Sequence, residues 1–555
     1  MLSCRNLSVY TSDGKTILRD VSAGFKPNAM NAVIGPSGCG KTTLIKAMLS
    51  IIDSSGESYF CGDKIVGSEQ LVGKVGFAPQ FTCAHTMLSV GEVVKNALDF
   101  SINDARVKEE RVEEILKIVG LWEHSDKLVG SLSGGQLRRI GLALELANDP
   151  SVMCCDEVTS GLDPLSENAI LDLLSSLCKD NGKTFICVIH NLAKLDYFDC
   201  ITVVFEGEVV FQGSLQELKQ YFQIDSALSL YDKLNAIGID VLRQKWDNQK
   251  SLALSQECID SLSPIGTQSR PNIFAQLVFL LIRRTKLFFR DSSCLLLTMA
   301  ITFGFPLVVV IFSIGGLPEI ESLALERNLG ALEELKVSLR SQISAANTSS
   351  VVVGLILFQV ILLSLMGANN SSSEIAGERN LYEKERLIGL NPIAYALSKI
   401  IFTSSIAIFQ GVWMCLFVKF ICKFPGSAVL QCAELSMIAV AMTLICLAFS
   451  SVFTSSEKAN MVSIYLVGFQ LPLSGVVLAL PEALKWVCRP FIAAYWGWAG
   501  YMGSMKETAI YDAYMQTKLI PEYMPSSSLA ITVLAIQSIL AICIIFYGCN
   551  QKKWK

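Results

Sequence analysis

The sequence predicts an α/β domain over residues 1–225, a connector over 226–270 and an all-α membrane domain with six helices over 271–555. Three observations support this division. The 555 residues exceed the roughly 250–300 that one hydrophobic core holds. Mean hydropathy is +0.45, and 17% of residues are charged, below the roughly 25% of soluble domains. Long windows without charge begin only after residue 270, so we expect that part to lie in lipid.

The membrane part is predicted from the length of its uncharged windows. A spanning helix needs about 20 mostly apolar residues, and six windows without Asp, Glu, Lys or Arg meet this need. The window 490–505 is shorter and carries three Gly, so we expect a re-entrant or external element there. The predicted helices are 294–317, 347–368, 394–418, 435–455, 459–480 and 527–548.

Charge and cysteine content exclude several classes of partner. The net charge of −4 comes without a basic stripe or acidic tail, so nucleic acid is not an expected partner. The 18 Cys lack the paired spacing of metal sites and are expected to be reduced thiols. The N-terminus has no basic segment followed by an apolar one, so we expect no signal peptide and a cytosolic N-terminus.

A phosphate-binding loop is the strongest motif of the first domain. The run from Gly35 to Thr42 reads GPSGCGKT, follows an apolar strand and precedes a helical segment. This is the context in which backbone N–H groups converge on phosphate oxygens. Lys41 is then expected to meet the β- and γ-phosphates, and the Thr42 hydroxyl to ligate Mg²⁺. The alternative, a Gly-rich turn without function, is a weak reading of so complete a motif.

Two further motifs agree with this interpretation. Leu132-Ser133-Gly134-Gly135-Gln136 precedes a helical run and places free amides at a helix N-terminus, which is a second anion site. The apolar strand that follows ends in two carboxylates. Asp156 is the expected Mg²⁺ partner, and Glu157 is the expected general base that polarises the attacking water.

The order of these motifs resembles an ATP-binding cassette ATPase, whose hallmark is the Leu-Ser-Gly-Gly-Gln signature. The resemblance implies that Tyr10 stacks on adenine, Gln80 senses Mg²⁺ and the membrane domain, Asp163 lies in the D-loop, and His190 contacts the γ-phosphate. Simpler roles are packing of a strand for Tyr10, capping of a turn for Gln80, and a core hydrogen bond for His190. The residues assigned to ATP and Mg²⁺ are Tyr10, Gly35, Pro36, Ser37, Gly38, Cys39, Gly40, Lys41, Thr42, Thr43, Gln80, Ser133, Gly134, Gly135, Gln136, Asp156 and Asp163.

Finer features are similar to subfamily G, the White and multidrug half-transporter group. These features are the segments 143–147 and 159–163, the charged segment 378–385 and Ala394-Tyr395. Val158 departs from the proline that the family usually has after the catalytic glutamate. The resemblance implies a type-2 exporter-like architecture, with the ATPase before the membrane domain.

The resemblance also implies a dimer of half-transporters. The chain has one phosphate loop and one signature, and in cassette ATPases each ATP lies between the loop of one domain and the signature of another. We therefore expect a second subunit, most simply a second copy. Coupling to the membrane domain is expected through the charged segment 373–386, for which the alternative is a solvated amphipathic helix. Both termini are expected in the cytosol of a multi-pass protein of a plasma or inner membrane.

The sequence indicates the substrate-binding residues less clearly than the nucleotide-binding residues. The candidates are Phe358, Gln359, Tyr465 and Phe469, in the second and fifth predicted spans, and a Gln there either binds substrate or bonds a neighbouring helix. Spans without charge favour a lipid-like or amphipathic apolar substrate in contact with membrane lipid. The alternative is a cassette ATPase that pulls on a partner. It is kept open by the segment 319–346, where Leu and Ile recur at helical spacing outside the predicted spans.

Overall fold

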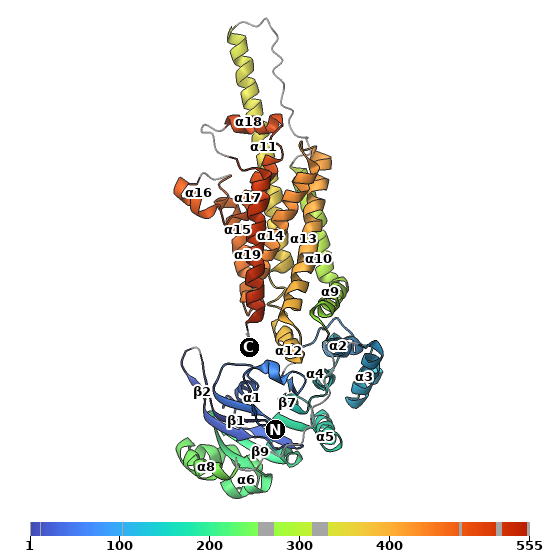
Figure 1. Cartoon of the computed structure of the whole chain (residues 1–555), viewed down its shortest axis with the longest axis vertical. Coiled ribbons are helices and arrows are strands. Elements are labelled where there is room, and N and C mark those ends of the chain that lie inside the picture. Colours follow the sequence, from blue (N-terminus) through green and yellow to red (C-terminus); the bar gives the residue numbers. More distant parts are fainter. Residues whose placement is uncertain are drawn as a thin grey trace. The chain divides into compact units, whose positions relative to one another are not determined.

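The computed structural model describes residues 2–11, 13–80, 82–102, 104–253, 271–312, 331–476, 480–517 and 524–551. The chain forms two compact units (Figure 1). The first contains Met1–Gln276 together with Asn380–Asn391, and the second contains Leu277–Arg379 and Pro392–Lys553. The first unit thus ends at Gln276, close to the predicted start of the membrane domain at residue 271, and one short helix of the later sequence also belongs to it.

A six-stranded sheet organises the first unit, in the order β10-β9-β3-β8-β7-β6. All neighbouring pairs are parallel except β9 with β10, which is a hairpin. Parallel strands covered on both faces are apolar runs without alternation, and β3, β7 and β8 are buried throughout. The loops that follow β3, β6, β7 and β8 therefore meet at one edge. The strands are β3 (Met30–Ile34), β6 (Val75–Ala78), β7 (Val152–Asp156), β8 (Thr184–Val188), β9 (Cys200–Phe205) and β10 (Glu208–Gly213).

A second, antiparallel sheet has the order β2-β1-β4-β5. Its inner residues share one hydrophobic core with α1, as Leu7, Phe25 and Leu44 illustrate. The strands are β1 (Leu2–Tyr10), β2 (Thr16–Gly24), β4 (Ser55–Phe60) and β5 (Asp63–Lys64). The helices of this unit are α1 (Lys41–Met48), α2 (Val90–Leu98), α3 (Ala105–Ile118), α4 (Gly134–Leu146), α5 (Pro164–Asn181), α6 (Leu215–Phe222), α7 (Leu230–Ile237), α8 (Ile239–Ala253) and α12 (Arg379–Ile388).

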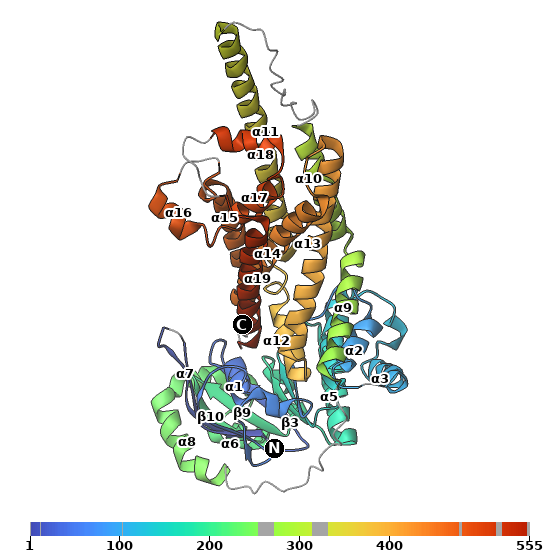
Figure 2. The same ribbon diagram turned by 45° about the horizontal axis from the view of Figure 1, so that its top comes forward.

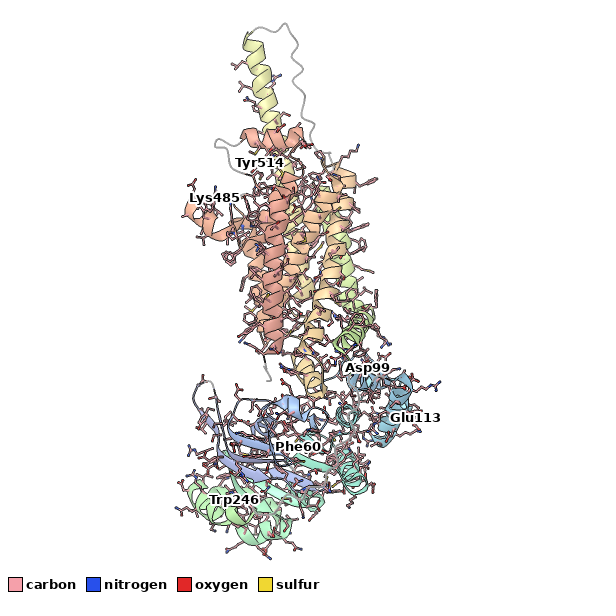
Figure 3. All side chains as sticks on the ribbon, in the orientation of Figure 1. Phe60, Asp99, Glu113, Trp246, Lys485 and Tyr514 are labelled. Atoms are coloured by element: carbon pink, nitrogen blue, oxygen red, sulfur yellow. The ribbon has the colours of Figure 1, made fainter. Side chains whose placement is uncertain are left out.

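The prediction of a connector from residue 226 was wrong for its first half. Residues 230–253 form α7 and α8, which pack on the α/β core. Leu234, Leu242 and Trp246 are almost fully buried, and Figure 3 labels Trp246 on α8. Arg243 also makes a bidentate ion pair with Glu208 of β10, at 2.7 and 2.6 Å. Apolar residues spaced three or four apart among charges anchor this segment. The rest of the predicted connector, 254–270, lies outside the described residues.

The second unit is all-α, as predicted. Five of its helices are long and apolar enough to cross a membrane among the residues that the structure describes. They match the first, second, third, fourth and sixth predicted spans and stand side by side in Figures 1 and 2. They are α10 (Ser292–Ile311), α11 (Ala331–Ser371), α13 (Pro392–Cys422), α14 (Ala428–Val452) and α19 (Ser527–Asn550).

The fifth predicted span, 459–480, is corrected by the structure. Residues Ser456–Leu473 form α15, which has 18 residues and begins with Glu457 and Lys458. These charges, together with Asn460, lower the mean hydropathy of α15. It is therefore not among the five described helices that are long and apolar enough to cross a membrane. Residues 477–479 lie outside the described part. The described chain thus contains five helices of spanning character where six were expected.

The remaining helices of the second unit are shorter, apart from α9 (Ile273–Arg290), which begins in the first unit. The window 490–505 forms α17 (Ala493–Gly503), whose 11 residues are too few to span a bilayer and are mostly buried. This agrees with the expectation of an element that does not span. The others are α16 (Glu482–Cys488) and α18 (Ala509–Thr517), and Figure 3 labels Tyr514 on α18.

The segment predicted to be external and helical is helical from Ala331 onward, and residues 319–330 lie outside the described part. It continues without interruption into the second span, so that α11 has 41 residues. The first half of α11 extends past the other helices of its unit (Figure 2). Leu335, Leu339 and Ile343 of the predicted apolar stripe are about half-exposed or more.

Candidate nucleotide-binding site

The phosphate loop joins the end of β3 to the start of α1. Its glycines have the backbone that the motif requires: Gly38 and Gly40 have φ of 79° and 101°. A Cβ on Gly35 would collide with the carbonyl oxygen of Val204, and one on Gly40 would lie 2.7 Å from Leu18 Cδ2. Only glycine fits these positions, so the loop closes tightly around its own N–H groups.

Lys41 lies inside this loop. Its ammonium donates to the carbonyl oxygens of Gly35 and Pro36, both at 2.9 Å, and the residue is 5% exposed. Its carbonyl hydrogen-bond partners are uncharged, and the Asp156 carboxylate is near enough for its charge to interact with the ammonium. A cation at a helix N-terminus fits an incoming phosphate.

Tyr231 of α7 also contacts the loop, and sequence reasoning missed it. The Gly35 N–H donates to the Tyr231 hydroxyl at 3.3 Å. Burial raises the pKa of this hydroxyl, so it stays neutral at ordinary pH. The residue falls within the segment that was predicted to be a connector, which is why no signal singled it out.

Thr42 and Asp156 form the predicted metal-binding pair. The Thr42 hydroxyl donates to Asp156 Oδ1 at 2.8 Å, which joins the start of α1 to the end of β7. Burial raises the pKa of Asp156, and the hydrogen bond from Thr42 opposes this shift. A hydroxyl and a carboxylate next to a phosphate loop are the oxygen ligands that Mg²⁺ uses with nucleotides. The residues therefore fit ATP with Mg²⁺, and Thr43 follows on the same helix.

Glu157 is the centre of a second polar cluster, one residue after β7. Its Oε2 accepts a hydrogen bond from Gln80 Nε2 at 2.8 Å, and its Oε1 lies 2.5 Å from His190 Nε2. Gln80 follows β6 and His190 follows β8, so adjacent parallel strands bring the three side chains to one edge of the sheet. Glu157 itself has φ of 52°, a left-handed backbone that turns the side chain out of the strand. The structure thus unites three residues that are far apart in the sequence.

The signature and the D-loop do not join this cluster. Ser133 caps α4 by accepting from the Gln136 N–H, and the Gln136 side chain accepts from the Ser133 N–H in return. Both Ser133 and Gly134 are exposed, and a Cβ on Gly134 would meet no atom within 4 Å. Asp163 caps α5, and hydrogen bonds from Ser166 lower its pKa. Over the described residues, no hydrogen bond or ion pair links Ser133 to the phosphate loop.

Tyr10 and the candidate substrate residues differ in exposure. Tyr10, at the end of β1, is 59% exposed and so is free to stack on a ring. Tyr465 and Phe469 are exposed one turn apart on α15. Phe358 packs edge-to-face on Phe312. Gln359 is fully buried, and its side-chain amide donates to the Leu355 carbonyl of its own helix at 3.4 Å. No described contact brings Gln359 together with the two residues of α15.

Comparisons with known proteins cover both units. Residues 18–160 match the family described as ABC transporter, and residues 275–505 match the family described as ABC-2 type transporter. The methionine import ATP-binding protein MetN of Caulobacter vibrioides is 32% identical over 235 residues, which are 41% of this chain and 71% of that protein. The chain belongs to the ATP-binding cassette transporter family.

Two further relatives are similar to this chain, one over its ATPase part and one over most of its length. ABC transporter G family member 23 of Arabidopsis thaliana is 34% identical over 249 residues, 41% of this chain and 40% of that protein. ABC transporter ATP-binding/permease protein Rv1747 of Mycobacterium tuberculosis is 24% identical over 510 residues, 88% and 56% of the two chains. The matches thus span about half of each relative. Together with the two domain families, the first confirms the resemblance to subfamily G half-transporters.

A solved structure also matches the ATPase part. It is cbiO1 from Clostridium perfringens, described as part of the ABC transporter complex cbiONQ. The identity is 29% and the TM-score 0.38, and the match covers 40% of this chain and 92% of that one.

Proposed function

We propose that the chain is a half-transporter that hydrolyses ATP as a dimer and uses this cycle to move a lipid-like or amphipathic apolar substrate across a membrane. The cluster around Glu157 supports the hydrolytic part. Bound ATP with Mg²⁺ supplies the phosphoanhydride that water cleaves. Glu157 accepts the proton of that water, while Gln80 and His190 hold its two oxygens in place. Lys41 and Thr42 position the phosphates and the metal.

The open signature is the observation that favours a dimer. Ser133 begins α4 with its N-terminus exposed, and no described interaction connects it to the phosphate loop. A helix N-terminus without an anion is a ready phosphate site. We infer that the signature of one copy completes the site of the other. Two isologous contacts then give two sites and bring together two membrane domains.

A mixing experiment tests this composite site. Ser133→Arg and Lys41→Ala are each expected to inactivate a homodimer, because each damages both sites. A heterodimer of the two variants keeps one intact site and has one doubly damaged site. The two variants carry different tags, so the heterodimer can be purified. We expect this heterodimer to hydrolyse ATP, whereas neither parent homodimer does. If the two parent homodimers and the heterodimer all hydrolyse ATP at the wild-type rate, the composite site of a dimer is contradicted.

A route for coupling runs through α12, whose residues from Asn380 onward belong to the first unit. Lys384 Nζ lies 2.9 Å from Glu145 Oε1 of α4, without the alignment of a hydrogen bond, and both residues are almost fully buried. Glu145 Oε2 in turn accepts from the Phe77 N–H at 3.0 Å. Phe77 lies on β6, three residues before Gln80. One ion pair therefore connects α12 with the signature helix and with the strand that leads to Gln80.

The residues that lead into α12, 374–379, form ion pairs and hydrogen bonds within the membrane unit. Arg284 makes a bidentate pair with Glu374, at 2.5 and 2.7 Å, and Lys399 bonds Glu374 and Glu378 at 2.9 and 2.5 Å. Arg379 donates to carbonyl groups at the ends of α14 and α19. The segment that continues into α12 is thus tied to several membrane helices at once. This supports a coupling element and not a solvated amphipathic helix.

The substrate class rests on the membrane unit. The exposed aromatic side chains of Tyr465 and Phe469 offer apolar contact with a polar tip, while Gln359 bonds its own helix and has no role in the proposal. A multi-pass membrane protein with both termini in the cytosol follows if the ATPase unit uses cytosolic ATP. The mechanical alternative, in which the ATPase moves an external partner, is favoured by one observation: the continuity of α11 from the predicted external segment into a span.

Reconstitution separates these functions. Purified transporter in lipid vesicles, with no other protein, is given ATP and a fluorescent phospholipid. We expect ATP-dependent movement of the labelled lipid between leaflets, absent for Glu157→Gln. ATP hydrolysis without movement of labelled lipid or of an amphipathic dye would favour the mechanical alternative.

A further inference from the structure

We propose that Glu434 is a proton-binding site of the membrane unit: its carboxyl group is neutral while α17 packs on α14, and it ionises when α17 moves away. Nothing in the proposed ATPase cycle uses this residue. Glu434 lies in the second turn of α14 and is fully buried. Among the residues that the structure describes, neither of its carboxyl oxygens has a hydrogen-bond partner.

The surface of α17 is shaped around this carboxyl group. A Cβ on Gly500 would collide with the Glu434 side chain, and a Cβ on Gly497 would lie 3.0 Å from Ile438 Cβ. Glu434 and Ile438 are one turn apart on α14, and Gly497 and Gly500 are one turn apart on α17. The two helices therefore pack closely through small residues, and the carboxyl lies directly against the backbone of α17. Water has no access to it in this packing.

An ionised carboxylate is not stable in this position. Removing a carboxylate from water without a counter-ion is strongly unfavourable, whereas a neutral carboxyl leaves only a polar group unpaired. The group therefore takes up a proton. When α17 separates from α14, water reaches the carboxyl, its O–H bond breaks and the proton passes to water.

The charged groups of the neighbouring helices are few. Over their described lengths, α17 and α19 carry no Asp, Glu, Lys or Arg, and α14 carries none besides Glu434. The charges of α11 fall within its first ten residues, those of α15 are Glu457 and Lys458, and Lys399 of α13 is paired with Glu374 and Glu378. The other titratable side chains on these helices are Cys415, Cys422, Cys432, Cys446, Cys543, Cys549, Tyr395, Tyr465, Tyr495, Tyr501 and Tyr547.

Lys419 of α13 is the remaining charge on the described lengths of these helices. Its ammonium donates to Gln431 Oε1 at 2.7 Å and to the carbonyls of Phe424 and Gly426, all uncharged acceptors. Gln431 lies three residues before Glu434 on α14, so the two side chains are neighbours on that helix. Over the described residues Lys419 forms no ion pair with Glu434, so the carboxyl group has no counter-ion in this packing.

Infrared spectroscopy tests the proton directly. Wild-type transporter in vesicles at neutral pH is expected to show a carbonyl band of a protonated carboxyl that Glu434→Gln lacks. Glu457→Gln, which removes an exposed carboxylate at the start of α15, is the matched control and is expected to keep the band. Gly500→Ala, which pushes on the carboxyl group, is expected to shift it. Identical bands in wild type and Glu434→Gln would show that Glu434 is ionised and would overturn the proposal.

The pH dependence of turnover tests whether the proton is linked to movement. A glutamine mimics the neutral carboxyl and cannot ionise. The rate of ATP hydrolysis by Glu434→Gln is therefore expected to lack the part of the pH dependence that comes from this group. Wild-type activity is expected to fall at alkaline pH, approaching about tenfold for each pH unit once the ionised form predominates. The ratio of wild type to variant removes pH effects on the nucleotide site itself. Parallel pH profiles would contradict the link between protonation and the movement of α17.

Discussion

Glu157→Gln is expected to lower steady-state ATP hydrolysis by about 10²–10⁴-fold, the range that a general base contributes. The amide keeps the shape of the side chain, and its oxygen still accepts one hydrogen bond, from Gln80 or His190. It cannot take the proton of the attacking water. Binding of a fluorescent ATP analogue should therefore remain close to wild type.

The matched variant is Lys41→Ala, which removes the charge that faces the phosphates. That change should weaken nucleotide binding itself, because a charge-assisted contact to phosphate is lost. Together the two variants separate catalysis from binding. Hydrolysis by Glu157→Gln at more than about a tenth of the wild-type rate would remove Glu157 from the role of base.

Lys384→Met is expected to cause the largest loss of stability, about 3–5 kcal/mol in the free energy of unfolding of the ATPase unit. The variant leaves the carboxylate of Glu145 buried between α4 and β6 without its counter-ion. Adding Glu145→Gln removes that charge while keeping an acceptor for the Phe77 N–H. The double variant should therefore recover most of the loss, as measured by denaturant unfolding of the detergent-solubilised protein.

An exposed ion pair of the same unit provides a control for this prediction. Lys95 Nζ lies 3.1 Å from Glu109 Oε1, and the two side chains are 45% and 70% exposed. A pair open to solvent contributes about 0–1 kcal/mol, so Lys95→Met should change stability little. A similar loss for Lys95→Met and Lys384→Met would show that the buried pair has no special role. Recovered stability in the double variant with transport still impaired would assign coupling to the charge pair itself.

The nucleotide site was largely predictable because each of its parts is a short continuous motif. The run around Lys41, the carboxylates Asp156 and Glu157, and His190 each follow an apolar strand, and parallel strands bring such loops to one edge. In the structure Glu157 contacts both Gln80 and His190 at this edge. That Tyr231 bonds the phosphate loop was not predictable, because only the fold brings residues 196 positions apart together.

The misses have physical reasons too. Residues 230–253 looked like a connector because their few apolar residues are diluted by charges, yet a single buried Trp246 and the Arg243 ion pair anchor them. Glu434 was missed because charged residues were used to end the fourth window, although α14 begins six residues earlier, at Ala428. The pairing of Lys384 with Glu145 depends on tertiary structure alone. No local pattern carries that information.

The continuity of α11 has a mechanical consequence. At 1.5 Å per residue its 41 residues measure about 60 Å, roughly twice the thickness of the hydrocarbon layer. Without a proline along its length, it has no built-in joint and behaves as a stiff rod. Such a helix tilts as one body about the part that packs against the neighbouring helices. A small tilt of the packed half therefore becomes a larger displacement at the end of the half that extends past them. A ligand that holds the free end would, by the same leverage, resist the conformational cycle from a distance.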